Sequence, residues 1–75
     1  MNIRNYINDY EFKMIILNNK INIVNYESII LLSEDKIVVT NGEFDILING
    51  QNLSILKLLD KELLISGVIK NIEFR

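Results

Sequence analysis

Cysteine, histidine, proline, tryptophan and alanine are all absent from this chain of 75 residues. Without cysteine no disulfide can form, and without cysteine and histidine a zinc site loses its usual ligands. Histidine is also the usual base that activates a serine nucleophile, so the hydroxyl side chains have no activating partner. We therefore interpret these hydroxyls as solvated or turn-capping groups: Ser28, Ser33, Thr40, Ser54 and Ser66.

Strong charge and long apolar runs are scarce as well. The net charge is −2, and the eight Lys and Arg residues are scattered, so no basic stripe is present to neutralise nucleic-acid phosphates. The apolar run at residues 29–32 is strand-sized and far shorter than the roughly 20 residues of a membrane span. The first ten residues lack the apolar core of a secretory signal, so we expect a cytoplasmic protein.

Acidic side chains occur in three close pairs, which could in principle perform acid–base chemistry or hold a hard cation. All three pairs lie in or beside predicted turns, where Asp and Glu are ordinary residues. We therefore expect no catalytic residues, no cofactor, no metal and no small-molecule substrate. The pairs are Glu34 with Asp35, Glu43 with Asp45, and Asp60 with Glu62.

The residues that are plentiful favour one small β domain. Hydrophobic residues make up 49% of the chain and are mostly Ile, Leu and Val, and β-branched Ile and Val fit a pleated sheet. Residues 1–10 have apolar side chains at helical spacing and predict a tail or short helical turn, whereas residues 11–75 alternate with period two. Eight short strands are expected, at residues 12–17, 20–24, 28–32, 36–40, 44–48, 53–57, 63–66 and 68–74.

Two Asn-Gly pairs predict two-residue hairpins, because Asn and Gly tolerate the positive φ of a type I′ turn best. The pairs are Asn41-Gly42 and Asn49-Gly50. In these hairpins Val39 is expected opposite Phe44, and Phe44 opposite Ile55, so both place the same apolar residues on one face of a meander spanning residues 36–57. Gly67 is expected at a further turn. The predicted core consists of Ile37, Val39, Phe44, Ile46, Leu53 and Ile55.

The alternation slips by one residue near the end of the chain, and a β-bulge at Lys70-Asn71 would restore it. The segments ILINGQNLSI and LLISGVIKNI also resemble one another. We expect an antiparallel β-sandwich of about seven to eight short strands, with a partly open barrel or a short β-solenoid as alternatives.

More aliphatic residues are present than the inner faces of one small sandwich accommodate. A contiguous exposed apolar patch marks an interface, although burial of some strands on both sides is the alternative explanation. The candidate interface residues are Ile15, Leu17, Leu32, Val38, Leu47 and Leu64. We expect a homo-oligomer or a complex with another protein.

The order of three short motifs resembles the YabP/YqfC family of sporulation proteins, and more closely its YqfC branch. The motifs are IVNY at residues 23–26, INGQNLSI at 48–55 and ISGVIKNI at 65–72. The resemblance implies a small β-sandwich that acts in the mother cell of endospore-forming bacteria during spore envelope or coat assembly. It further implies a partner that is a polytopic membrane protein at the forespore membrane, and it brings no catalytic residues.

Three hypotheses therefore compete at the level of sequence. The first is a protein–protein interaction module of sporulation, and the second is a structural homo-oligomeric scaffold without a dedicated partner. The third, a small enzyme or cation-binding protein, requires a carboxylate cluster that the sequence does not place.

Overall fold

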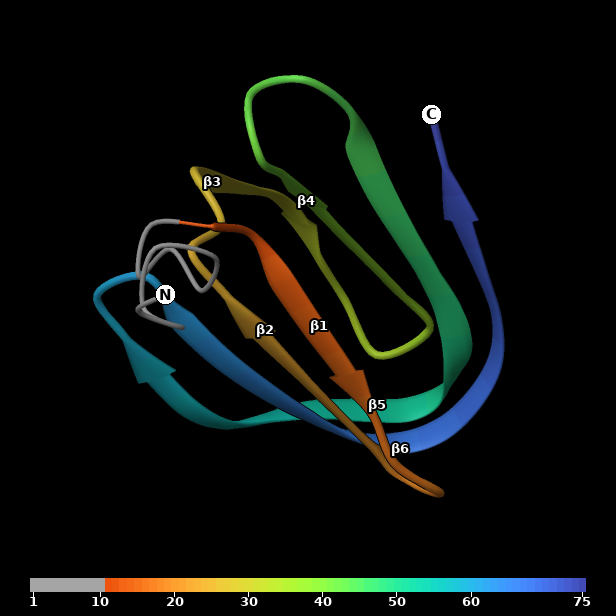
Figure 1. Ribbon diagram of the computed structural model, residues 1–75. Coiled ribbons are helices and arrows are strands. Elements are labelled where there is room, and N and C mark those ends of the chain that lie inside the picture. Colours follow the sequence, from red (N-terminus) through yellow and green to blue (C-terminus); the bar gives the residue numbers. More distant parts are fainter. Residues whose placement is uncertain (1–10) are drawn as a thin grey trace, which may run out of the picture.

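The computed structural model describes residues 11–75, and these form six β-strands (Figure 1). The tail or helical turn expected at residues 1–10 lies outside the described residues. The strands are β1 (Lys13–Ile16), β2 (Lys20–Val24), β3 (Ser28–Leu32), β4 (Lys36–Thr40), β5 (Asp45–Leu59) and β6 (Glu62–Phe74).

All six strands belong to one antiparallel sheet with the order β1-β2-β6-β5-β4-β3. The two long strands β5 and β6 bend sharply near their middles, so the sheet folds over on itself (Figure 1). One layer consists of β3, β4, the first half of β5 and the second half of β6, and the other consists of β1, β2 and the remaining halves. The all-β fold is confirmed, and the folded sheet is not closed into a barrel.

The strand count differs from the expectation because two pairs of predicted strands are each one continuous strand. Residues 44–48 and 53–57 fall in or beside β5, and residues 63–66 and 68–74 both fall within β6. The turn residues that suggested boundaries instead sit where the strands bend.

The predicted hairpin at Asn49-Gly50 is wrong, because both residues lie inside β5, where Asn49 is opposite Asn71 and Gly50 is opposite Ile69. Gly50 is needed for space, since a Cβ atom there would overlap the carbonyl oxygen of Val68. The prediction that Gly67 marks a turn is wrong for the same reason, because it lies within β6.

The loop at Asn41-Gly42 is real but longer than expected. Residues 41–44 connect β4 to β5, and Thr40 is opposite Asp45, so the predicted two-residue loop is wrong and the observed loop is two residues longer at its C-terminal end. The Asn41 side-chain oxygen accepts hydrogen bonds from the backbone N–H groups of Glu43 (2.9 Å) and Phe44 (3.0 Å), and Gly42 has a φ of 95°. The side chain of Asn41 thus organises the wider loop.

The core lies between the two layers, and the inward-facing side chains of both contribute to it. Eight of them have no exposed surface: Ile21, Ile23, Ile37, Val39, Ile46, Ile48, Leu63 and Ile65. Of the predicted core residues, Ile37, Val39 and Ile46 are in this group, Leu53 is 5% exposed, and Phe44 and Ile55 pack against the cluster while partly exposed. The predicted pairings shift, because Val39 is opposite Ile46 instead of Phe44, and Ile55 is opposite Ile65.

Candidate protein-binding surface

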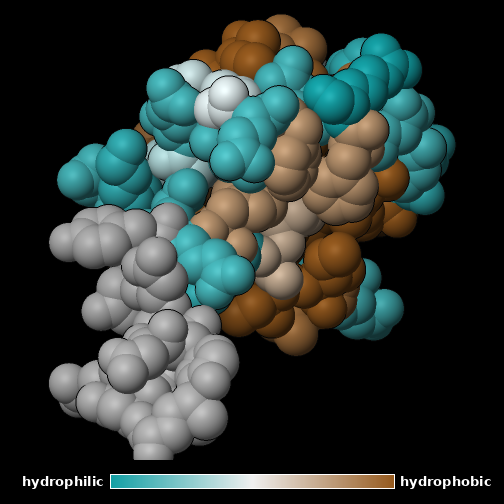
Figure 2. Space-filling view, turned by 45° about the horizontal axis from the view of Figure 1, so that its top comes forward, coloured by the Kyte–Doolittle hydropathy of each residue, from teal (hydrophilic) through white to brown (hydrophobic). Residues whose placement is uncertain are grey.

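The surface of the described residues carries many large apolar side chains, and they gather on strand segments that lack a neighbour on one side. Figure 2 shows hydrophobic atoms in several patches set between hydrophilic ones. The segments with a free side are β1, β3, the part of β5 at residues 54–59 and the part of β6 at residues 68–74. The exposed apolar residues are Ile15, Ile16, Leu17, Ile30, Leu31, Leu32, Leu56, Leu58, Leu59, Val68 and Phe74.

Three of these four free edges carry a β-bulge, which is an extra residue that has no partner on the neighbouring strand. The extra residues are Ile30 on β3, Leu56 on β5 and Lys70 on β6. The bulge predicted at Lys70-Asn71 is thereby confirmed. The pairing of β1 with β2 runs from Lys13 to Ile16 with no shift of register, so β1 is the regular edge.

The six candidate interface residues fall into two groups. Ile15, Leu17 and Leu32 are more than half exposed, and Leu64 is partly exposed. The prediction is wrong for Val38 and Leu47, which are each only 8% exposed. The two lie directly opposite one another on β4 and β5, which have neighbouring strands on both sides at this point.

The three phenylalanines form a cluster at one end of the sandwich. The ring of Phe44 contacts those of Phe12 and Phe74 edge-on, with centroids 5.8 Å apart in each case. A hollow beside them is lined by two aromatic and four polar residues: Glu11, Phe12, Asn25, Asn41, Glu43 and Phe44. Phe74 is 57% exposed, so the cluster extends the apolar surface of the β6 edge.

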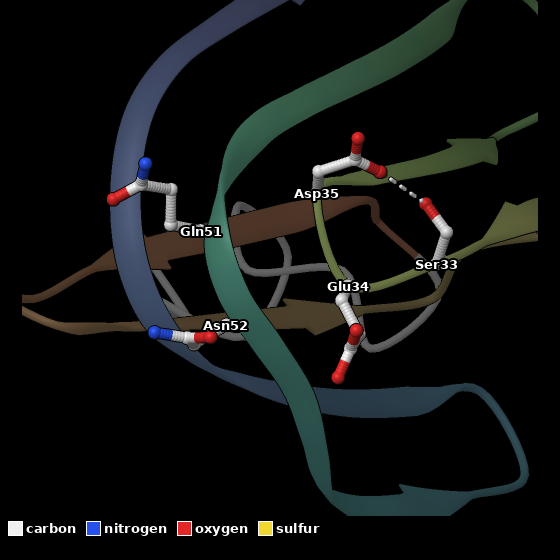
Figure 3. Close-up of a pocket in the computed structure, with 5 residues that line it drawn as sticks. All are labelled: Ser33, Glu34, Asp35, Gln51 and Asn52. Atoms are coloured by element: carbon white, nitrogen blue, oxygen red, sulfur yellow. Dashed lines mark hydrogen bonds between the residues drawn. The ribbon is translucent and has the colours of Figure 1, made fainter.

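A second hollow lies where the turn between β3 and β4 meets the bend of β5 (Figure 3). It is lined by Ser33, Glu34, Asp35, Gln51 and Asn52. The Ser33 hydroxyl donates to the Asp35 carboxylate at 2.8 Å (Figure 3). The carbonyl oxygens of Asp35 and Glu34 accept from the backbone N–H groups of Gly50 (3.0 Å) and Leu53 (2.8 Å). These contacts fasten the turn onto the bent strand.

Three further hydroxyl groups have structural partners. The hydroxyls of Ser54 and Ser66 lie 3.0 Å apart across β5 and β6, and the Thr40 hydroxyl donates to the carbonyl oxygen of Phe44. Within residues 11–75 no three Asp, Glu, His or Cys side chains come together in a group that could hold a metal ion. Over the same residues no helix is long and apolar enough to cross a membrane.

Sequence reasoning missed several exposed apolar residues, among them Leu56, Leu58 and Leu59. A bulge places its extra residue out of the regular alternation, and a free edge is recognised only from the order of strands in the sheet. The sequence signal for a bulge is a break in the alternation of apolar and polar residues. Only the break near Lys70 was identified in this way.

Comparison with known proteins yields one match. The model of the YabP family covers residues 9–75, which include every strand of the fold. No curated protein and no solved structure shows significant similarity. The family resemblance drawn from the three motifs is thereby confirmed, and the placement in the YqfC branch stays a prediction.

Proposed function

Because the chain belongs to the YabP family, which implies a role in sporulation, we propose that it is a non-enzymatic protein-binding module of spore envelope or coat assembly. The observation that carries this proposal is the gathering of exposed apolar side chains on unpaired strand edges. An open edge offers backbone donors and acceptors, and apolar neighbours make its burial by another chain favourable.

The partner that best fits the family resemblance is a polytopic membrane protein, which the chain would meet from the cytoplasm of the mother cell at the forespore membrane. Binding by strand addition needs only an extended segment with apolar side chains in such a partner. The exposed residues of β3 support apolar side-chain contact with such a partner, because Ile30, Leu31 and Leu32 follow one another without a charged residue among them.

A second candidate function is a homo-oligomeric scaffold with no sporulation-specific partner. The presence of several free edges on one small domain favours it, because a molecule with more than one binding edge can extend an assembly. The two functions differ in what purified protein does alone. Light scattering shows large assemblies for a scaffold, and a small defined species for a module that awaits its partner.

Deletion of the gene in its endospore-forming host tests the proposal, and the readout is the number of heat-resistant spores. We expect fewer spores from the deletion strain and full rescue by the wild-type gene. The variants Leu32→Lys and Leu58→Lys place a charge on exposed edge positions and should rescue poorly, whereas Gln51→Lys at an exposed polar position should rescue fully. Normal sporulation of the deletion strain would contradict the proposal.

A further inference from the structure

The free edge of β1 differs from the other free edges in being regular. Bulges on β3, β5 and β6 insert unpaired residues, and such insertions twist an edge away from regular pairing with another strand. The register of β1 against β2 is uniform from Lys13 to Ile16, and the strand contains no proline. It therefore keeps the geometry that an added strand requires.

The direction of the backbone groups on β1 follows from one hydrogen bond. The N–H of Leu17 donates to the carbonyl oxygen of Lys20 at 2.8 Å, so Leu17 points its backbone groups toward β2. These directions alternate along an antiparallel strand. The backbone N–H and carbonyl groups of Lys13 and Ile15 therefore also point toward β2, whereas those of Met14 and Ile16 point toward the free side. The free edge thus offers two N–H groups and two carbonyl groups.

We propose that a second copy of this chain pairs with β1 through its own β1, in an antiparallel arrangement about a two-fold axis at Ile15. Met14 of each copy then lies opposite Ile16 of the other, and each of these pairs exchanges two backbone hydrogen bonds. Ile15 lies opposite Ile15 of the second copy, in the close pairing without hydrogen bonds. Two six-stranded sheets thereby join into one.

The side chains suit a second copy because every pairing in this register is compatible. Ile15 meets Ile15, and Met14 meets Ile16. The one charged residue of the strand, Lys13, lies opposite Leu17 and so does not face its own equivalent, which avoids repulsion of like charges. Ile15, Ile16 and Leu17, each more than half exposed in a single copy, all lie in the contact.

This inference deepens the proposed function, on which it rests for its place in spore assembly, but pairing through β1 is a property of the purified protein. A cross-linking experiment tests the register directly. The chain has no cysteine, so Ile15→Cys introduces a single thiol that would sit opposite itself across the axis. The expected Cα separation in a close antiparallel pair, about 4.5 Å, is within the range that a disulfide spans.

Under mild oxidation, Ile15→Cys should form a covalent dimer at least about tenfold faster than Leu58→Cys, because pairing makes the reaction of two thiols effectively unimolecular. Leu58 is a matched control, since its exposure (56%) is close to that of Ile15 (52%) and it lies on a bulged edge. Equal cross-linking rates for the two variants would overturn the proposal, and circular dichroism verifies that both are folded.

A second variant tests the hydrogen bonds. Ile16→Pro removes an N–H group from the free side and leaves the bonds to β2 in place, so wild-type protein should sediment as a dimer and this variant as a monomer. A wild-type monomer at high concentration, or a dimer that Ile16→Pro leaves unchanged, would overturn the proposal. If the purified protein pairs through β1 but its deletion leaves sporulation normal, only the proposed function is refuted. If the protein is a monomer but its deletion blocks sporulation, only the pairing is refuted.

Discussion

Gly50 on β5 lies so close to Val68 on β6 that a Cβ atom on residue 50 would overlap the Val68 carbonyl oxygen. Gly67 makes the reverse approach, because a Cβ atom there would lie 2.7 Å from the carbonyl oxygen of Asn52 on β5. Each long strand therefore carries a glycine where it packs against the backbone of the other. The bend that folds one sheet into two layers depends on this close contact.

Substitution of Gly50 by alanine should therefore destabilise the fold. The added methyl group meets backbone atoms that cannot move without separating β5 from β6, and we expect a loss of roughly 2 kcal/mol or more in the free energy of unfolding. Urea denaturation measures the loss. Gly42→Ala is the control, since its Cβ would meet only the flexible side chain of Glu27, and the strain of its positive φ should cost about 1 kcal/mol. If Gly50→Ala proved the milder change, the packing at the bend would be looser than the structure shows.

The two Asn-Gly pairs show what the sequence could and could not predict. Glycine permits positive φ, and it also permits close approach of another backbone. The same dipeptide therefore suits the loop at Asn41-Gly42 and the bend at Asn49-Gly50, where β5 lies close to the backbone of β6. Local sequence does not distinguish these uses. The inner face was nevertheless predictable. Val39 was expected opposite Phe44 and lies opposite Ile46, a shift of two residues, and a shift of two keeps every side chain on its face.

The candidate surface was harder to predict, because exposure depends on which strands lie at the edges of the sheet. Val38 and Leu32 are both aliphatic residues in short apolar strands, yet Val38 is in a central strand and Leu32 is in an edge strand. The order of the strands follows from contacts between residues far apart in the chain. A periodic pattern assigns a residue to a face and leaves the position of its strand undetermined.

The loop between β4 and β5 should depend on the side chain of Asn41. Asn41→Ala removes the acceptor of two backbone N–H groups, and we expect a loss of about 1 kcal/mol in stability. Asn41→Asp retains an acceptor oxygen at the same position and should stay close to wild type. Thermal melting of the three proteins compares them directly, and equal melting temperatures for Asn41→Ala and Asn41→Asp would show that water replaces the lost acceptor.

The phenylalanine cluster should contribute a measurable coupling between the loop and the end of β6. A double-mutant cycle with Phe44→Leu and Phe74→Leu separates the ring contact from the loss of each ring alone. We expect a coupling free energy of about 0.5–1.5 kcal/mol, which is typical of edge-on aromatic pairs. A coupling indistinguishable from zero would mean that the exposed Phe74 ring does not hold its contact with Phe44 in solution.

Substitution of Leu47 tests whether the middle of the outer face of the sheet is covered or exposed to solvent. It lies opposite Val38, which in turn lies opposite Leu31, so the three form a row across β5, β4 and β3. Leu47 is 8% exposed and Leu31 is 44% exposed. Leu47→Lys should cost roughly 2 kcal/mol or more, because the ammonium group must leave a covered site and the leucine packing is lost.

Leu31→Lys, on the same face but at the edge, should change stability by no more than about 0.5 kcal/mol. In a domain of this size each kcal/mol corresponds to a shift of about 4–8 °C in melting temperature, so calorimetry resolves the two variants readily. If Leu47→Lys instead melted with the wild type, the middle of this face would be open to solvent. Leu47 and Val38 would then belong to the binding surface after all, and the exposed apolar surface would extend inward from the edges across the sheet.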